Sequence, residues 1–379
     1  MDLNLSDEQQ QLVDSFGALY AKDSPPERVR AAEAATPTGH DPELWLRLQE
    51  NGALDMAVDE DSGGWGASLL DLALVAEQHG RYLGSAPLLE AQAAARLLGR
   101  LGSDAKNAPA GRRRAAGLLE AALADARLVT LALHPPTAGG VLPLVPAGAI
   151  ADDVVFFDGS TLRHLALDGE GDGARRSVTN IGSLPLADIA VPAASTTELA
   201  SGAEAAAAFD EAANEWMILV AGALVGLGAR SLEIGVEYVK ERKAFGVPIG
   251  SFQAVSHGLA DAATALDGAT LLAREAAWSA EVEPARTPEL GPLAFGFCTE
   301  AAREASYRSL HYHGGYGFML EYDIQLYFRR ARGWPAQFAE PDVAFGVAAA
   351  RRLSARNAAA SEGDAAASKG NAAASEGEV

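Results

Sequence analysis

The stretch from Lys240 to Gln253, KERKAFGVPIGSFQ, holds the residues best suited to ligand chemistry. Arg242 lies in a charged segment that ends at Lys243, and Phe245, Gly246 and a Pro-Ile-Gly turn follow it. A guanidinium can bind an anionic group through two parallel hydrogen bonds, and glycine lets a backbone approach a ligand closely. The simpler interpretation is a solvated charge at the C-terminal end of a helix. That interpretation does not explain why the helix runs into a loop of aromatic residues and glycines.

A second block, HYHGGYGF, begins at His311 and contains Gly314 and Gly315. The two glycines indicate either a tight turn or a close approach of the backbone to a ligand. The block is followed by Tyr-Phe-Arg-Arg-Ala-Arg, which ends at Arg332. For His257 and His313 we expect packed or hydrogen-bonded structural roles.

Together, these blocks resemble the acyl-CoA dehydrogenase family. The family series R-x-x-F-G, P-I, F-Q and H-x-L-A-D occurs in order between Arg242 and Asp261, and HGGYGF follows. The segment GGWGASLLDLALVAEQHGR from Gly63 is similar to the family's glycine loop and the helix after it. The resemblance covers nearly all of residues 1–356. It implies an FAD-dependent enzyme that desaturates an acyl-CoA thioester, in which a carboxylate removes the α-proton and the flavin accepts a hydride.

The resemblance also implies that part of this chain binds a cofactor held mainly by a neighbour. In the family, the matching residues contact the diphosphate and adenosine half of an FAD whose flavin ring lies in the adjacent subunit. His311 stands where the family usually has Gln. The implied cofactor-binding residues are Arg242, Phe245, Gln253, His311, Gly314 and Gly315.

The residues that would bind the flavin ring within the same chain do not match. Family members carry T-E-P and then G-S-D early in the β domain, whereas residues 128–140 here read LVTLALHPPTAGG. The usual W-x-T is also missing from the sequence, and the β domain is shorter than the family norm. The resemblance therefore implies that this half of the flavin site has been lost.

The position of the catalytic base is unusual as well. Counting on from Arg332, the family's commonest glutamate position falls on Phe338, with Glu340 close by. The alternative position, counted back from Phe245, falls on Trp216, with Glu215 next to it. One residue along a helix is a rotation of about 100°, so Glu215 is a poor substitute. Glu215 and Glu340 remain candidate bases, and a surface or ion-paired role is the simpler interpretation of each.

Three hypotheses follow for function. The chain is a subunit of a heteromeric acyl-CoA dehydrogenase, similar to those of actinobacterial lipid or steroid catabolism, and lends FAD contacts to a related catalytic partner. Alternatively, it is a self-sufficient homo-oligomer with Glu215 or Glu340 as base, or a non-catalytic acyl-CoA-binding scaffold. The resemblance implies an acyl-CoA substrate, a dimer or tetramer (a heterotetramer in the first case) and an electron-transfer flavoprotein as acceptor.

The elements that must position these residues form a mainly α-helical protein with a small β domain. Apolar periodicity predicts helices after Ser6, at 41–48, 69–83 and 87–101, and long helices at 209–241, 252–281, 288–313 and 320–356. Short runs between Arg127 and Val191 predict strands. With the resemblance, this predicts an N-terminal helical domain (1–126), a middle β-barrel-like domain (127–195), a C-terminal four-helix bundle (201–356) and a disordered tail (357–379), a short helix being the alternative for the tail.

Composition restricts the class of protein and the compartment that the sequence suits. A formal charge of −21 argues against a nucleic-acid-binding protein, since phosphates are bound by clustered Lys and Arg. The single cysteine, Cys298, forms no internal disulfide, and no Cys/His spacing indicates a metal site. The N-terminus has no signal-peptide pattern, and the longest uncharged run, Trp216–Ala229, is 14 residues. We therefore expect a cytoplasmic protein outside the membrane.

Overall fold

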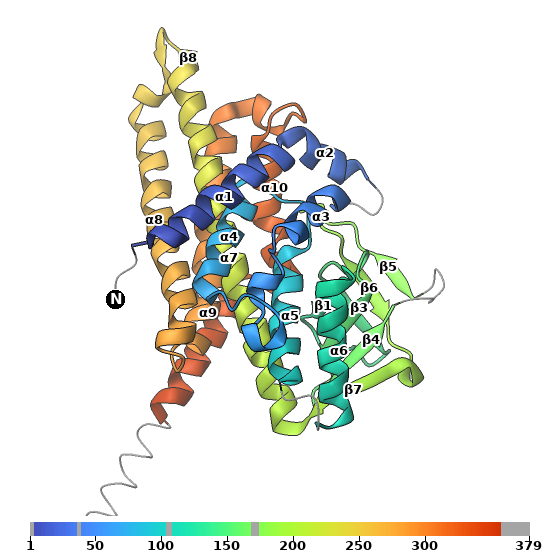
Figure 1. The fold of residues 1–379 in the computed structure, drawn as a ribbon. Helices are drawn as coiled ribbons and strands as arrows, with labels where there is room; N and C mark the ends of the chain where they lie inside the picture. The colour runs from blue at the N-terminus through green and yellow to red at the C-terminus, as the bar shows by residue number, and fades with distance from the viewer. Residues whose placement is uncertain (1–3, 36–38, 104–107, 168–173, 358–379) are drawn as a thin grey trace, which may run out of the picture.

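The computed structural model describes residues 4–35, 39–103, 108–167 and 174–357. The N-terminal part is helical, and Figure 1 shows its helices in blue and cyan beside the long helices of the C-terminal part. Two of its helices begin as the sequence predicts, because Ser6 forms a capping box with Gln9 and Asp41 accepts from two backbone amides. The helices are α1 (Asp7–Asp23), α2 (Pro26–Ala34), α3 (Pro42–Glu50), α4 (Leu69–Arg81), α5 (Leu88–Gly102) and α6 (Ala110–Ala124), with short 3-10 turns η1 (Asp55–Ala57) and η2 (Glu60–Ser62).

The middle of the chain forms two small sheets. One has the order β1-β3-β4-β7 and the other β2-β6-β5; β1 pairs with β3 in parallel, and the other pairs of these sheets are antiparallel. The first four strands coincide with four of the short runs predicted to be strands, LVTLAL, VLPLV, DDVVFF and TLRHLAL. The strands are β1 (Val129–Ala132), β2 (Val141–Val145), β3 (Asp153–Phe157), β4 (Thr161–Ala166), β5 (Arg175–Ser177), β6 (Ala187–Ala190) and β7 (Thr196–Ser201), with the 3-10 turn η4 (Ala193–Ser195).

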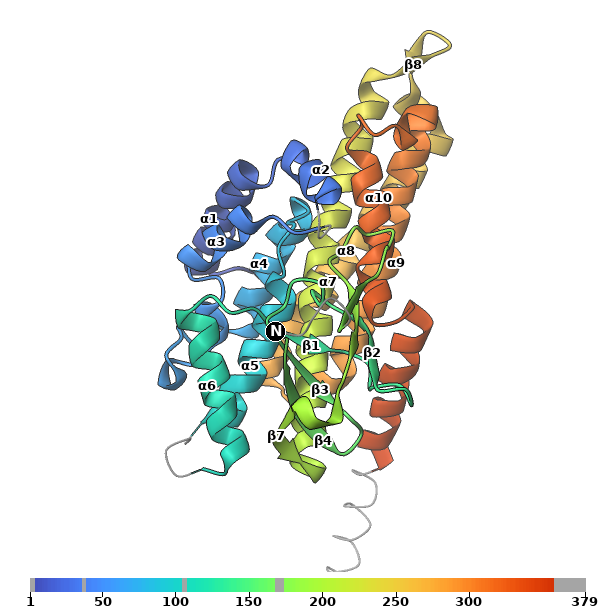
Figure 2. The same ribbon diagram turned by 90° about the vertical axis from the view of Figure 1, so that its right-hand side faces the viewer.

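Three long helices dominate the C-terminal part: α7 (Gly202–Glu241), α8 (Gln253–Val282) and α9 (Thr287–His313). At one end of this bundle, the hairpin of β8 (Lys243–Ala244) and β9 (Val247–Pro248) and the turn η5 (Ile249–Ser251) join α7 to α8. Figures 1 and 2 both show this hairpin at the top, at the opposite end of the long helices from the sheets. One described helix, α7, is long and apolar enough to cross a membrane, but 72% of its most apolar window is buried inside the protein, as in a core helix.

The predicted helix over 320–356 is wrong as a single element. The structure has η6 (Gly314–Phe318), α10 (Ile324–Gly333), η7 (Pro335–Gln337) and a last helix whose described part is 341–357. Proline lacks a backbone N–H and disfavours helix at the residue before it, so Pro335 and Pro341 divide the segment. The predicted tail lies outside the described residues, except for Asn357, which is helical.

The N-terminal helices pack closely against α7 through glycines. A Cβ placed on Gly80 of α4 would lie 1.7 Å from the Ala223 carbonyl oxygen, and one on Gly226 would lie 1.8 Å from the Glu77 carbonyl oxygen. No side chain fits at such distances, so these glycines permit the contact between α4 and α7. The residues of α4, α5 and α7 contribute to one apolar core with both sheets.

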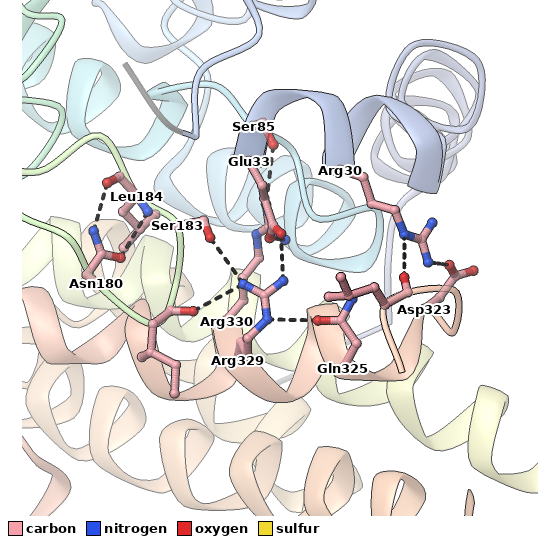
Figure 3. Close-up of polar contacts among 12 residues, drawn as sticks. Arg30, Glu33, Ser85, Asn180, Ser183, Leu184, Asp323, Gln325, Arg329 and Arg330 are labelled. Carbon is pink, nitrogen blue, oxygen red and sulfur yellow. Dashed lines mark hydrogen bonds and ion pairs between the residues drawn. The ribbon is translucent and has the colours of Figure 1, made fainter. Parts of the chain in front are cut away.

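A polar cluster connects α10 to the rest of the molecule (Figure 3). Glu33 of α2 accepts from Arg329 at 2.6 Å and from the buried Arg330 at 2.8 Å. Arg329 also donates to the Ser183 hydroxyl at 3.1 Å, in the loop before β6. The Arg-Arg pair therefore joins N-terminal, middle and C-terminal segments, and it fixes the chain that follows α10.

Candidate functional site

The β8–β9 hairpin presents Phe245 to solvent. Its loop has two residues, Phe245 with φ 53° and Gly246 with φ 86°, because Ala244 pairs directly with Val247. Two positive φ values are the geometry of a type I′ turn, which favours Asn-Gly and is strained for phenylalanine. The Phe245 side chain is 96% exposed. An exposed aromatic residue in a strained turn has no role in this chain's own core, which favours a role in binding.

Arg242 lies directly below this turn. Its guanidinium carbon is 6.0 Å from the centre of the Tyr316 ring, within reach of a cation–π contact. Arg242 is exposed and forms no ion pair with any residue that the structure describes. Its charge is therefore available to an anionic ligand.

The remaining predicted cofactor residues lie at the same end of the bundle. Gln253 is exposed at the start of α8, and His311 is exposed near the end of α9. The centres of the His311 and Tyr307 rings are 5.8 Å apart. Gly314 has φ 60°, and a Cβ on Gly314 or Gly315 would meet no atom within 4 Å. The structure thus places all six predicted residues at the same end of the bundle, and a side chain at either of the two glycines would meet open space.

The neighbouring histidines differ from one another. His313 is buried; its Nδ1 lies 2.7 Å from the Ser309 carbonyl oxygen, and its ring stacks on Tyr238 at 3.9 Å. Burial lowers the pKa of His313 below its ordinary value. This is the structural role expected for it, whereas His257 is exposed on α8.

The two positions that the resemblance assigns to a catalytic base contact one another, Trp216 being buried and Phe338 half-buried. The rings of Trp216 and Phe338 are 6.1 Å apart, and Phe295 packs against both at 6.0 and 5.8 Å. His134 stacks on Phe338 from the other side, and its Nε2 lies 3.1 Å from the Gln337 carbonyl oxygen. We refer to Trp216, Phe295, Phe338 and His134 as the aromatic cluster. Its members offer no carboxylate to a substrate.

Glu215 lies outside this cluster and faces two arginines of α5. It is buried and accepts from Arg96 at 2.9 Å and from Arg100 at 2.8 Å. Two guanidinium groups occupy the carboxylate oxygens. The 100° step expected from the sequence thus separates Glu215 from Trp216.

Glu340 is exposed at the surface rather than enclosed. It pairs with Arg303 at 2.5 Å, and that guanidinium lowers the pKa of the Glu340 carboxyl. A lowered pKa makes a carboxylate a weaker base. Neither predicted carboxylate therefore lies in a suitable setting for abstracting a proton.

Sequence reasoning missed the buried carboxyl of Glu90 on α5. It is 9% exposed, and burial raises its pKa to about 7, although its own backbone amide and the nearby Trp216 indole oppose the rise. The Trp216 N–H lies near it but has no hydrogen-bond partner in the described part of the chain. The only signal in the sequence was a glutamate among apolar residues in PLLEAQAAA, and the periodicity there indicated only a helix.

Comparisons with known proteins fit this geometry. The family model of the acyl-CoA dehydrogenase N-terminal domain matches residues 6–112, and that of the C-terminal domain matches residues 206–336. This chain belongs to the acyl-CoA dehydrogenase family, which consists of FAD-dependent oxidoreductases that act on the CH–CH bond of acyl-CoA thioesters.

A relative in Mycolicibacterium smegmatis, acyl-CoA dehydrogenase IpdE2, is 33% identical over 87% of this chain and 94% of its own. The solved ChsE4-ChsE5 complex from Mycobacterium tuberculosis contains a chain of the same fold (TM-score 0.75, 25% identity, 95% of this chain and 99% of that one). The fold is also that of the Tcur3481-Tcur3483 steroid acyl-CoA dehydrogenase (TM-score 0.78, 23% identity, 92% and 99%).

The two halves of the cofactor site fit FAD unequally. At the hairpin end, an unpaired guanidinium, an exposed aromatic ring and two open glycines are donors and surfaces suited to a nucleotide diphosphate. On the inner side, β1 is buried along its whole length, and His134 just after it contacts Phe338 and Gln337. The outer half therefore fits FAD, and the inner half does not.

Proposed function

We propose that this chain is the subunit of a heteromeric acyl-CoA dehydrogenase that contributes FAD contacts to a related catalytic partner. The partner would bind the flavin ring and supply the carboxylate base, and FAD would accept the hydride. This chain would bind the diphosphate and adenosine half of that cofactor. The single observation that carries the proposal is the contrast between an open, unpaired outer surface and an inner site filled by the aromatic cluster.

Several features support this division. Arg242 has no acidic partner among the described residues, and Phe245 is exposed in a strained turn. Neither feature would be needed in a scaffold that binds no cofactor. A self-sufficient enzyme needs a base, and both candidate carboxylates are held in ion pairs with arginine. The solved ChsE4-ChsE5 complex pairs two chains, and one matches this chain along nearly all of its length.

The substrate class follows from relatives only at a coarse level. The Tcur3481-Tcur3483 protein is described as a steroid acyl-CoA dehydrogenase. We propose that this chain likewise acts in steroid or lipid catabolism, in a dimer or heterotetramer that transfers electrons to an electron-transfer flavoprotein. We also propose the domain limits that the sequence predicted, 1–126, 127–195 and 201–356.

The test is to change Arg242 in this chain and to measure the flavin bound by the complex. The chain is co-purified with a related acyl-CoA dehydrogenase chain from the same genome, and FAD is quantified by absorbance. We expect Arg242→Ala to weaken FAD retention about tenfold to a hundredfold, the loss of one bidentate charge-assisted contact. Arg47→Ala, which removes an exposed arginine on α3, is the matched control and should leave FAD unchanged. Equal FAD content in the Arg242 variant and the wild type would refute the proposal.

A further inference from the structure

A small cavity lies beside Glu90, where three parts of the chain meet. It is enclosed by α4, α5 and α7, by the segment Leu184–Pro185 of the middle part and by Trp334 and Gln337 after α10. Its volume is ≈ 30 Å³, which is enough for one or two water molecules. The walls are mostly apolar side chains, and Glu90 is the only carboxyl among the described lining residues.

Glu90 has no cation to balance a negative charge in this cavity. Its carboxyl makes no ion pair with any described residue. His79, across the cavity on α4, is neutral, because burial lowers its pKa to about 3, and its Nδ1 lies 3.0 Å from the Tyr20 hydroxyl. Arg330 acts on His79 from α10, but Glu33 already binds that guanidinium.

The other elements packed against α5 supply no balancing charge either. The described cations on these elements include Arg112, Arg113 and Arg114 on α6 and Arg230 and Lys240 on α7, and none of these five lines the cavity. The carboxylates Asp55 on η1, Glu120 on α6 and Glu215 on α7 do not line it either. The residues of β1 are not titratable. Leu184 and Pro185 close the cavity with apolar surface. A carboxylate at this place therefore costs free energy unless water enters.

We propose that Glu90 is a proton-dependent latch at this junction. With a proton on Glu90, the Leu184–Pro185 and Trp334–Gln337 segments stay closed on α5. Loss of that proton favours an open form in which water solvates the carboxylate and the two segments separate from the helix. The latch concerns the junction itself and does not depend on flavin binding.

The direction of the pH effect follows from linkage. The closed form binds the proton more tightly than the open form, in which the Glu90 pKa returns to its ordinary value of 4.5. The closed form is therefore favoured most below pH 4.5, and its advantage declines as the pH rises to about 7. Between pH 6 and pH 8, the equilibrium constant for opening should rise about tenfold.

Hydrogen exchange on the full chain, in the assembly in which it purifies, tests this latch. After correction for intrinsic exchange rates, peptides covering Leu184–Pro185 and Trp334–Gln337 should show the tenfold rise in the wild type. Glu90→Gln, which mimics the protonated acid, should abolish that rise, and Glu120→Gln, an exposed change on α6, should retain it. No rise in the wild type, or an equal rise in Glu90→Gln, would overturn the proposal.

If the Glu90→Gln variant does not fold, a measurement on the wild type alone still tests the proposal. The infrared spectrum of the wild type at pH 6 should contain a protonated carboxyl band that is lost at pH 8, while the exchange of the same peptides increases. A carboxyl that is ionised already at pH 6 would also overturn the latch.

Discussion

Phe245 and Phe338 are the same residue type in different environments, one exposed and the other packed against aromatic rings. Among single residues, this contrast is the main support for the proposed function. Phe245 is exposed in a left-handed turn, whereas Phe338 packs against Trp216 and Phe295. The family motif alone predicted that Phe245 binds a cofactor. The packing of Phe338 was not predictable, because only the fold brings residues 216, 295 and 338 together.

This contrast leads to paired substitutions. Phe245→Asn should stabilise the hairpin by about 1 kcal/mol, because asparagine tolerates the positive φ, while FAD retention by the complex falls. Phe338→Ala should do the opposite, lowering the free energy of unfolding by about 3 kcal/mol and leaving FAD per folded complex unchanged. Urea unfolding and flavin absorbance measure the two effects. If the Phe338→Ala variant lost FAD and the Phe245→Asn variant did not, the aromatic cluster, and not the hairpin, would govern cofactor binding.

At the scale of elements, α10 matters because it fixes the segment that carries Gln337 and Phe338. Helical periodicity predicted α4, α5, α8 and α9 close to their observed limits, since each presents a clear apolar face or a buried run. It predicted the C-terminal end of α7, but that helix begins at Gly202 rather than at 209. It missed the breaks around η7, where prolines override an otherwise helical pattern. It also could not show that Glu33, almost 300 positions away, binds the arginines of α10.

Glu33→Ala should therefore be costly. Arg330 is only 2% exposed, and burial lowers its pKa to about 10, so removal of Glu33 leaves a buried, uncompensated guanidinium. We expect a loss of about 3–5 kcal/mol in the free energy of unfolding. Asp323→Ala, which breaks the more exposed pair with Arg30 in Figure 3, should cost less than about 1 kcal/mol. Similar losses for the two variants in chemical denaturation would show that the buried cluster has no special role.

At the scale of the whole molecule, the family and the architecture were predictable, because ordered motifs extend through both helical parts of the sequence. The same motifs predicted the six candidate cofactor residues, which the structure places at one end of the bundle and whose binding of FAD is our proposal. The state of the inner half of the site could not be predicted, because the absence of the family motifs does not show which residues take their place. Only the fold shows that aromatic side chains occupy the positions that the resemblance assigns to a base. Only the fold, too, shows that Glu90 is buried without an ion pair to any described residue, whereas the buried Glu215 is paired with two arginines.

If the partner holds the flavin ring and this chain only its outer half, the number of FAD molecules bound per chain will depend on the partner. The chain is purified alone and together with a related partner chain, and FAD per chain is measured before and after addition of acyl-CoA. We predict a colourless protein alone, and one FAD per pair in the complex, with bleaching only in the complex. Yellow protein that is bleached by acyl-CoA in the absence of any partner would contradict the account.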